Sequence, residues 1–159
     1  MRHAYPFTLT HDEDGRLVVA FPDVQGASTD GADETEAMAN AGDCLIAALI
    51  GYITLRKPIP RPSPVRGRST VTLPPLVAAK LALYSAMLEQ HVTNADLADR
   101  MRKSESEVRR LLDLDRRSNI GQIEAALAEL GKRLEIRVRD AASSRRRGGT
   151  PPLTIALRH

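Results

Sequence analysis

Hydrophobic residues follow a period of two in the first part of the chain. Tyr5, Phe7 and Leu9 alternate with Pro6 and Thr8, which is the spacing of a β-strand with two different faces, and residues 17–21 form a short apolar run that ends at Pro22. The expected strands cover residues 5–9, 17–21 and 27–29. Apolar residues then recur every three or four positions through Ile53, which predicts a helix capped by Asp33 or Thr35. The pattern therefore predicts a β-β-β-α unit, one helix on a small sheet.

Prolines interrupt the pattern after this helix. Four prolines alternate with other residues between 58 and 64, and they favour an extended linker because proline cannot continue a helix. A short strand is expected at residues 70–73. The linker with this strand, residues 58–74, is therefore expected to separate two domains.

The helical period returns at Pro75 and persists through most of the second half. Capping-box patterns begin at Thr93, Ser104 and Asn119, and Gly131 supplies a C-terminal stop. The expected helices cover residues 75–90, 93–101, 104–112 and 119–130. Short helices with separate caps predict a helical domain over residues 75–139.

The last alternating segment needs a partner strand. Leu134, Ile136 and Val138 alternate with charged residues, which predicts a strand with one solvated face. An unpaired strand edge is unfavourable, so this strand is expected to pair with residues 71–73 or with the same strand of a second copy. The second option predicts a homodimer. Residues 140–159, which include three consecutive arginines, are expected to form a disordered basic tail.

Composition and charge narrow the class of protein. A single cysteine, Cys44, excludes an internal disulfide framework and fits a reducing, cytoplasmic compartment. No apolar run approaches the ~20 residues of a transmembrane helix, so no membrane partner is expected. The net charge of +3 is unevenly distributed, because residues 1–57 hold nine acidic residues against four basic ones. An acidic first domain followed by a basic remainder predicts two partners of opposite charge.

Residues 93–112 have the spacing of a helix-turn-helix. Two short helices are joined by two or three residues, and the small side chain of Ala98 allows them to cross closely. Polar residues then lie on the outer face, where they would reach a DNA major groove. Asn94 and Lys103 are candidate phosphate contacts. The remaining DNA-binding candidates are Ser104, Ser106, Arg109 and Arg110, of which the arginines could hold guanine with two hydrogen bonds.

One residue of the expected turn departs from the usual pattern. Arg102 stands where glycine is common, so either its backbone is strained at positive φ or the turn has another geometry. A plain helical bundle with solvated charges has the same spacing, and spacing alone does not separate the two interpretations.

The carboxylates of the first domain allow two interpretations. Clustered Asp residues would suit a metal-dependent hydrolase. Most of these residues lie in expected turns, where Asp makes local hydrogen bonds, and no His lies at ligand spacing. We therefore expect no catalytic residue, metal or cofactor. A basic protein partner fits the charge better. Candidate contacts for it are Phe21, Pro22, Asp23, Val24 and Asp30, with core packing as the alternative for Phe21.

Several short motifs follow one another in a characteristic order across both expected domains. The N-terminal motifs are Tyr5–Leu9, Phe21-Pro22-Asp23 followed by Gly26, Thr29-Asp30-Gly31 and Glu36-Ala37. The later motifs are Ile59-Pro60-Arg61-Pro62-Ser63-Pro64, Val71-Thr72-Leu73-Pro74, Lys80, Leu83, Leu97-Ala98, Val108, Arg110-Leu111 and Ala126–Leu134. In this order and spacing, over nearly all of residues 3–139, the sequence resembles the HicB antitoxin family in its helix-turn-helix form.

The resemblance implies an α+β fold and two functions. Residues 1–57 would form a truncated RNase H-like domain without nuclease activity, and residues 75–139 would bind DNA and dimerise. The implied partners are operator DNA and a HicA toxin, a small basic ribonuclease with a catalytic His and a fold like that of double-stranded-RNA-binding domains. The expected protein is an antitoxin that covers this mRNA-cleaving toxin and represses its own operon as a homodimer or higher oligomer. The alternative is a stand-alone helix-turn-helix regulator with a ligand-sensing N-terminal domain.

Overall fold

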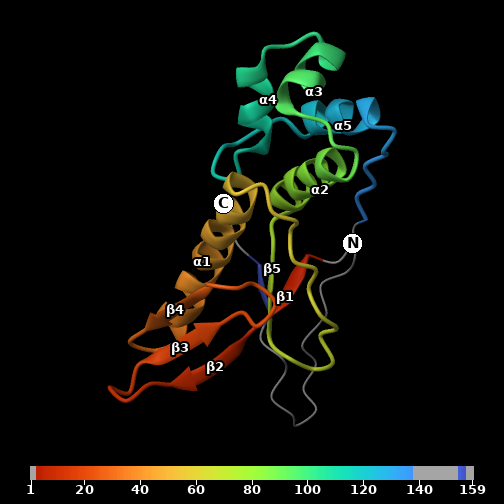
Figure 1. Cartoon of the computed structure of the whole chain (residues 1–159). Coiled ribbons are helices and arrows are strands. Elements are labelled where there is room, and N and C mark those ends of the chain that lie inside the picture. Colours follow the sequence, from red (N-terminus) through yellow and green to blue (C-terminus); the bar gives the residue numbers. More distant parts are fainter. Residues whose placement is uncertain (1–2, 138–153, 157–159) are drawn as a thin grey trace.

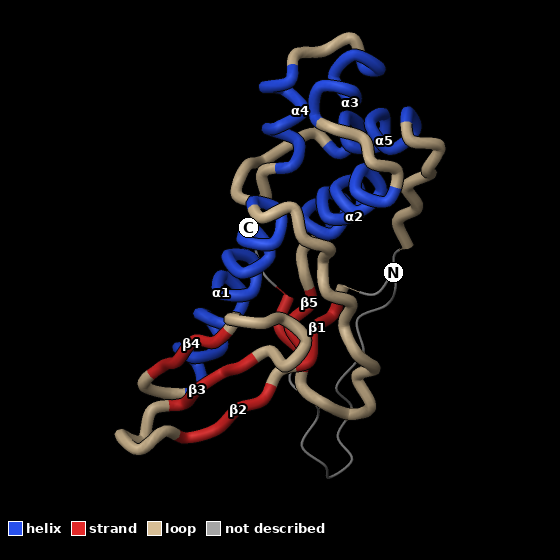
Figure 2. Tube along the Cα trace, viewed as in Figure 1, coloured by secondary structure: helices blue, strands red, loops and turns tan. Residues whose placement is uncertain are grey.

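The computed structural model describes residues 3–137 and the strand at 154–156. The molecule is elongated, with two small sheets and the long helix α1 at one end and the short helices α3, α4 and α5 at the other (Figure 1). Figure 2 shows the same division by secondary structure, with the strands gathered in one half and α2 leading into the helical half. The mixed architecture confirms the predicted α+β class. The finer prediction of an RNase H-like domain stays a prediction.

The first sheet is an antiparallel meander covered by one helix. Its strands are β2 (Thr8–His11), β3 (Leu17–Ala20) and β4 (Ser28–Gly31), and the helix is α1 (Glu34–Thr54). Val19 lies at the centre, opposite Leu9 on one side and Thr29 on the other. Gly31 permits the close approach of β4 to α1, because a Cβ there would lie 2.2 Å from the Ala37 nitrogen. The predicted β-β-β-α order is therefore confirmed.

Helix α1 is the central packing element of this half. The Asp33 side chain caps its start by accepting a hydrogen bond from the Glu36 N–H at 2.9 Å, as one of the two predicted caps would. By length and composition α1 is the one helix within the described residues that could cross a membrane, a test that core helices of globular domains also pass. Its inner face packs in the core through Ala37, Met38, Ala41, Gly42, Leu45, Ile46 and Leu49.

A second sheet joins distant parts of the chain. Its strands are β1 (Ala4–Pro6), β5 (Thr70–Thr72) and β6 (Thr154–Ala156), with β5 in the middle. Tyr5 lies opposite Val71 in the antiparallel pair, and Val71 lies beside Ile155 in the parallel pair. The predicted strand at 5–9 is thus two strands in two sheets, since the chain leaves one sheet and enters the other at Phe7.

Two predictions about the end of the chain need correction. Residues 154–156 form a strand although the whole tail was expected to be disordered, because the free edge of β5 offers them a partner. Residues 134–137 were expected to be part of a strand, but in the single chain they are not in one, and the expected pairing with a second copy stays a prediction. Both edges of β5 are already paired, so the expected partner at 71–73 is occupied. Val138 and the rest of the tail, 139–153 and 157–159, lie outside the described residues.

The proline-rich segment is fastened to the structure at several points. The Tyr5 hydroxyl donates to the Pro60 carbonyl at 2.8 Å, and the Tyr84 hydroxyl donates to the Lys57 carbonyl at 2.9 Å. The Asp23 carboxylate accepts from both the N–H and the hydroxyl of Ser63. These bonds hold the segment against both halves of the molecule.

The helical half packs around its own apolar core. Its helices are α2 (Pro75–Glu89), α3 (Asn94–Met101), α4 (Glu105–Leu112) and α5 (Ile120–Glu129). Leu83, Leu97, Val108 and Ile123, one from each helix, are fully buried together. The first turn of α2 also contributes Val77 to the core under the sheets, so the two halves share packing.

Candidate nucleic-acid and protein interfaces

Helices α3 and α4 form a closely packed pair with a three-residue connection. Leu97 and Ala98 of α3 are buried against Val108 and Leu111 of α4, as the apolar pattern predicted. Arg102, the first residue of the connection, is left-handed with φ 54° and ψ 45°. The turn therefore has the conformation expected for a glycine in this place, and a non-glycine residue there is strained by about 1–2 kcal/mol.

Both helices begin with a reciprocal capping box. Thr93 exchanges hydrogen bonds with Asp96, and Ser104 exchanges them with Glu107. The Ser104 backbone N–H, Lys103 and the Ser104 hydroxyl lower the pKa of the Glu107 carboxyl to about 2. The Ser104 side chain, a predicted DNA contact, is thus bonded within the protein. Its role in the structure is to fix where α4 starts.

The outer face of α4 presents the other predicted contacts. Ser106, Arg109 and Arg110 are all exposed. Arg109 donates to Glu105 at 2.7 Å, and its side chain remains 68% exposed, so the ion pair is a weak, solvated one. The two arginines follow one another on the helix and consequently face different hollows, one on each side of α4.

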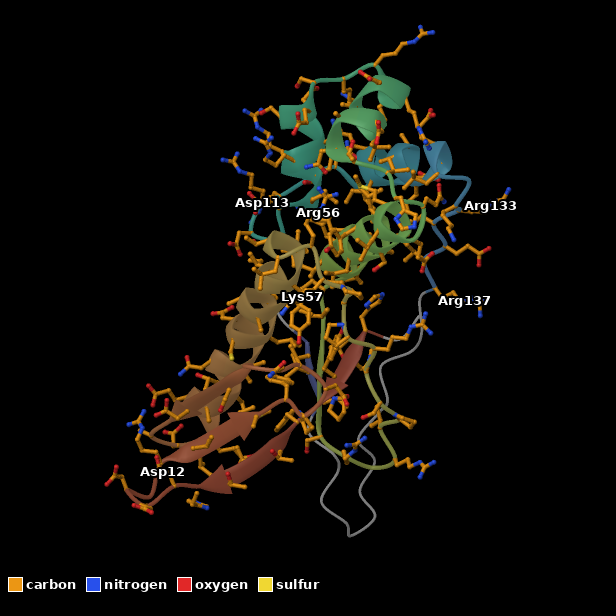
Figure 3. All side chains as sticks on the ribbon, viewed as in Figure 1. Asp12, Arg56, Lys57, Asp113, Arg133 and Arg137 are labelled. Carbon is orange, nitrogen blue, oxygen red and sulfur yellow. The ribbon has the colours of Figure 1, made fainter. Side chains whose placement is uncertain are left out.

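The hollow beside Arg109 lies where the two halves of the molecule meet. Asn94 and Arg109 line it together with Arg56 and His91, over a volume of about 640 Å³. Figure 3 shows Arg56 just beyond the end of α1, next to the helical half. Arg56 and His91 both have positive φ, and each follows the C-cap residue of a helix. The Arg56 guanidinium offsets the negative end of the α1 dipole, which gives this residue a structural explanation.

The hollow beside Arg110 is a smaller and more basic cleft. Lys103 and Arg110 line it with two residues that sequence reasoning missed, Arg116 and Arg117. The volume is about 300 Å³. This missed pair lies in the loop after α4. The feature of the sequence that could have indicated it is two adjacent arginines shortly after a predicted recognition helix. The structure therefore brings two predicted and two unpredicted cations to one cleft.

A buried lysine supports this loop from below. The side chain of Lys80, on α2, is 0% exposed, and its ammonium donates to the backbone carbonyls of Asp113 and Arg116. Burial lowers the Lys80 pKa, and the carboxylates of Asp113 and Asp115 act in the opposite direction. Figure 3 shows Asp113 where α4 ends above α1. Lys80 thereby joins α2 to the backbone that carries the two loop arginines.

The predicted protein-binding residues are mostly used by the fold. Phe21 is 3% exposed and Val24 is 1% exposed, and the Phe21 ring packs edge-on against Phe7 with centroids 6.1 Å apart. Core packing, the alternative considered for Phe21, is what the structure shows. Asp23 binds Ser63, and Asp30 forms an ion pair with Arg16. Of the five candidates, Pro22 alone is exposed.

Exposed carboxylates lie elsewhere on the same half of the molecule. Asp12 marks the tip of the β2–β3 hairpin in Figure 3, at the end of the molecule away from the helical half. Its side chain accepts from the backbone N–H groups of Asp14 and Arg16, so the acidic turn is ordered by its own carboxylate. Within the described residues, no three His, Cys, Asp or Glu side chains are grouped so that they could hold a metal ion.

Comparison with known proteins identifies the family. The family described as HicB-like antitoxin of bacterial toxin–antitoxin systems matches residues 4–82. The chain is 39% identical over 132 residues to Antitoxin HicB 2 of Photorhabdus laumondii, covering 83% of this chain and 94% of the relative. It is 35% identical over 133 residues to Antitoxin HicB of Escherichia coli, covering 83% and 96% respectively.

A third relative extends the same similarity. Antitoxin HicB of Pseudomonas fluorescens is 32% identical over 133 residues, covering 82% of this chain and 91% of the relative. These alignments span most of both chains, so the similarity extends beyond the N-terminal half. An antitoxin family agrees with the expectation of a regulatory protein rather than an enzyme. The chain therefore belongs to the HicB antitoxin family of bacterial toxin–antitoxin systems.

Proposed function

We propose that this antitoxin neutralises a basic, mRNA-cleaving HicA-like toxin in the cytoplasm and represses its own operon. The observation that carries the proposal is the separation of charge in a member of the HicB family: acidic residues 1–57 precede a helical half with exposed arginines. Residues 1–57, as a truncated RNase H-like domain, would bind the toxin. Helices α3 and α4 would act as a helix-turn-helix on operator DNA.

The toxin-facing surface would be built from the exposed acidic residues and Pro22. The hairpin tip at residues 12–14 and the start of α1 at residues 33–36 carry exposed carboxylates. Complementary charge accelerates association with a basic partner and keeps nucleic acid away from this domain. Asp30 would contribute its charge at the edge of the same surface, although Arg16 partly neutralises it.

Growth rescue tests the toxin-binding proposal. We expect a gene for a small basic, HicA-like protein beside this one. When the chain is co-expressed with that protein, the partner is expected to arrest growth alone and to be harmless in the presence of the antitoxin. Replacing the exposed Glu13 and Asp14 by Lys, which leaves the Asp12 hydrogen bonds of the turn in place, should slow association at low salt by about tenfold or more. The matched control, Glu124→Lys on α5, should associate at the wild-type rate. A neighbouring protein that is harmless alone, or never bound, would refute this part of the proposal.

Binding to the DNA upstream of its own gene tests the operator proposal. Arg109→Ala and Arg110→Ala are each expected to weaken specific binding by ~1–3 kcal/mol, measured by fluorescence anisotropy or gel shift. Arg133→Ala, an exposed arginine beyond α5, is the control. Unchanged affinity of both α4 variants would exclude α4 as the reading helix.

A two-fold dimer would complete the repressor. Two copies would place their recognition helices about 34 Å apart, on successive major grooves of a palindrome. Residues 134–137 are not in a strand in the single chain. In the dimer, the alternating segment 134–138 would pair with the same segment of the second copy. A footprint with two protected half-sites one helical turn apart supports the dimer, and a single uninterrupted half-site argues for a monomer.

A further inference from the structure

The cleft beside Arg110 is lined by four basic side chains, and its loop is held in place by the buried Lys80. Base recognition by α4 alone requires neither feature. We infer that the cleft binds one phosphate of the DNA backbone, with Arg116 and Arg117 as its ligands and Arg110 at its border with the reading helix. The inference rests on the proposed operator function and adds to it a second point of contact from the loop after α4. It assigns Arg116 and Arg117, which come from outside the helix pair, to DNA binding.

The charges that line the cleft leave an excess of free cations. Four basic side chains and a single carboxylate, Glu107, line it within the described residues. Glu107 is already bonded to Lys103 and to the Ser104 cap, so those charges compensate one another. Arg116 forms an ion pair with Asp113 at 3.3 Å, but its side chain is 64% exposed. In such a solvated pair the carboxylate is readily replaced by another anion.

Two of the arginines have no ion-pair partner in the described part of the chain. Arg110 and Arg117 are both exposed and both line the cleft. A guanidinium presents its donors in a planar fork that matches two oxygens of a phosphate, and this geometry makes arginine the usual residue for such sites. Convergence of these forks on one cleft gives an anion several charged hydrogen bonds at once.

The lining residues and the size of the cleft favour a charged group rather than an apolar molecule. Leu111 is the one apolar residue among the lining residues that the structure describes. Small-molecule pockets are mostly apolar and are commonly larger than these 300 Å³. Ser118, Asn119 and Gln122 supply further polar atoms around the rim. A single phosphate with its water fits this composition.

The loop that carries the cleft is held in place from below. The buried ammonium of Lys80 fixes the backbone carbonyls of Asp113 and Arg116, immediately beside the two arginines. A fixed backbone reduces the entropy lost when the side chains order around an anion. The cleft also adjoins α4, because Glu107 and Arg110 line it together with the loop arginines, so an anion held there lies beside the helix that the proposed function directs at DNA.

The salt dependence of DNA binding tests the assignment. The full chain is titrated with two duplexes of equal length, the DNA upstream of its own gene and a scrambled sequence, between 0.05 and about 0.5 M salt. For Arg116→Gln/Arg117→Gln we expect the slope of log K against log salt to fall by about 1, equally for both duplexes. Binding near 0.1 M should weaken by about tenfold, and the loss should shrink as salt rises.

Matched variants separate a phosphate contact from other effects. Arg116→Lys/Arg117→Lys keeps the charge and should keep most of the slope, whereas Arg133→Gln removes an exposed charge elsewhere and should leave the slope unchanged. Wild-type slopes in the glutamine variant would overturn the phosphate site. A loss confined to the upstream duplex would also overturn it, because a backbone contact does not depend on sequence.

The outcomes distinguish this inference from the proposed function. If the wild type binds both duplexes equally but the glutamine variant still loses slope, operator recognition is refuted and the phosphate site stands. If operator binding is selective and the slope stays unchanged, the proposed function stands and the site is refuted. A wild type that binds neither duplex refutes both.

Discussion

In the sheet-containing half, acidic residues predicted to meet a partner are bonded to the chain itself, whereas in the helical half several predicted cations remain exposed. Asp23 holds Ser63 and Asp30 pairs with Arg16, and Asp12, which was not among the predicted contacts, likewise orders its own hairpin. On α4, by contrast, Arg110 is exposed and Arg109 makes only a solvated pair. Charged residues in the sequence therefore indicate an accessible binding surface in the helical half, but not at the predicted contacts of the sheet-containing half.

The difference follows from side-chain length and from local structure. An Asp carboxylate lies close to its own backbone, so in a turn it accepts nearby N–H groups and contributes to the fold. An Arg on the outer face of a helix has no unpaired backbone acceptor within reach and extends into solvent. Acidic residues in turns are consequently weaker evidence for a binding surface than basic residues on an amphipathic helix.

Lys80 is the exception in the helical half, and its replacement should have the largest effect. Lys80→Met keeps most of the volume but leaves the carbonyls of Asp113 and Arg116 without their charged donor. We expect the free energy of unfolding to fall by about 2–4 kcal/mol. Urea denaturation followed by circular dichroism measures it.

The control for this variant is an exposed lysine. Lys132 forms only a 3.6 Å surface pair with Glu89, so Lys132→Met should change stability by less than about 0.5 kcal/mol. Equal effects of the two substitutions would mean that the buried ammonium is not a structural support.

Asp23 tests the comparison from the acidic side. Asp23→Ala removes the acceptor for both hydrogen bonds from Ser63 and should destabilise the fold by about 1–2 kcal/mol, measured by thermal or urea unfolding. Asp14→Ala, at an exposed turn position, should be nearly neutral. If Asp23→Ala is as stable as wild type and only toxin binding suffers, Asp23 belongs to the interface instead.

Tyr5 gives a dependence of stability on pH. Burial, with a smaller contribution from the Asp23 charge, raises the pKa of its phenol to about 12. The unfolded chain then loses this proton near pH 10 while the folded chain keeps it, so stability present below pH 10 is lost as the pH rises towards 12.

Tyr5→Phe isolates this term. The variant should lose about 1 kcal/mol at neutral pH, because the bond to the Pro60 carbonyl is missing. Its unfolding free energy should then fall less steeply than that of the wild type between pH 10 and 12. Parallel curves over that range would show that Tyr5 is not the titrating group.

Local signals in the sequence predicted the helices well. Asp33, Thr93 and Ser104 cap helices as expected, because capping depends on residues only two or three positions away. Strand partners depend on distant residues. The alternation at 134–138 matched a strand pattern without a free edge to join, and the pairing of β6 with β5 had only a weak alternation to indicate it.

In the candidate DNA-binding site, the residues on helices were predictable from the sequence and the residues in the loop were not. Helical spacing identified the exposed arginines of α4, since periodicity determines which face of a helix is buried. Arg116 and Arg117 lie in a loop, where no period relates sequence to direction. The burial of Lys80 was equally invisible, because it depends on carbonyls contributed by a loop more than thirty positions later.

Arg102 offers the smallest expected effect and the sharpest test of the turn between α3 and α4. With φ at 54°, Arg102→Gly relieves the left-handed strain but loosens the unfolded chain, for a net stabilisation of about 0.5–1 kcal/mol. Arg100→Gly, two residues earlier within α3, should instead destabilise by about 1 kcal/mol. Opposite signs for two Arg→Gly changes so close together are expected because Arg102 is left-handed and Arg100 is helical. If both destabilise, the turn is not left-handed in solution, and the position of α4 relative to α3 must be revised.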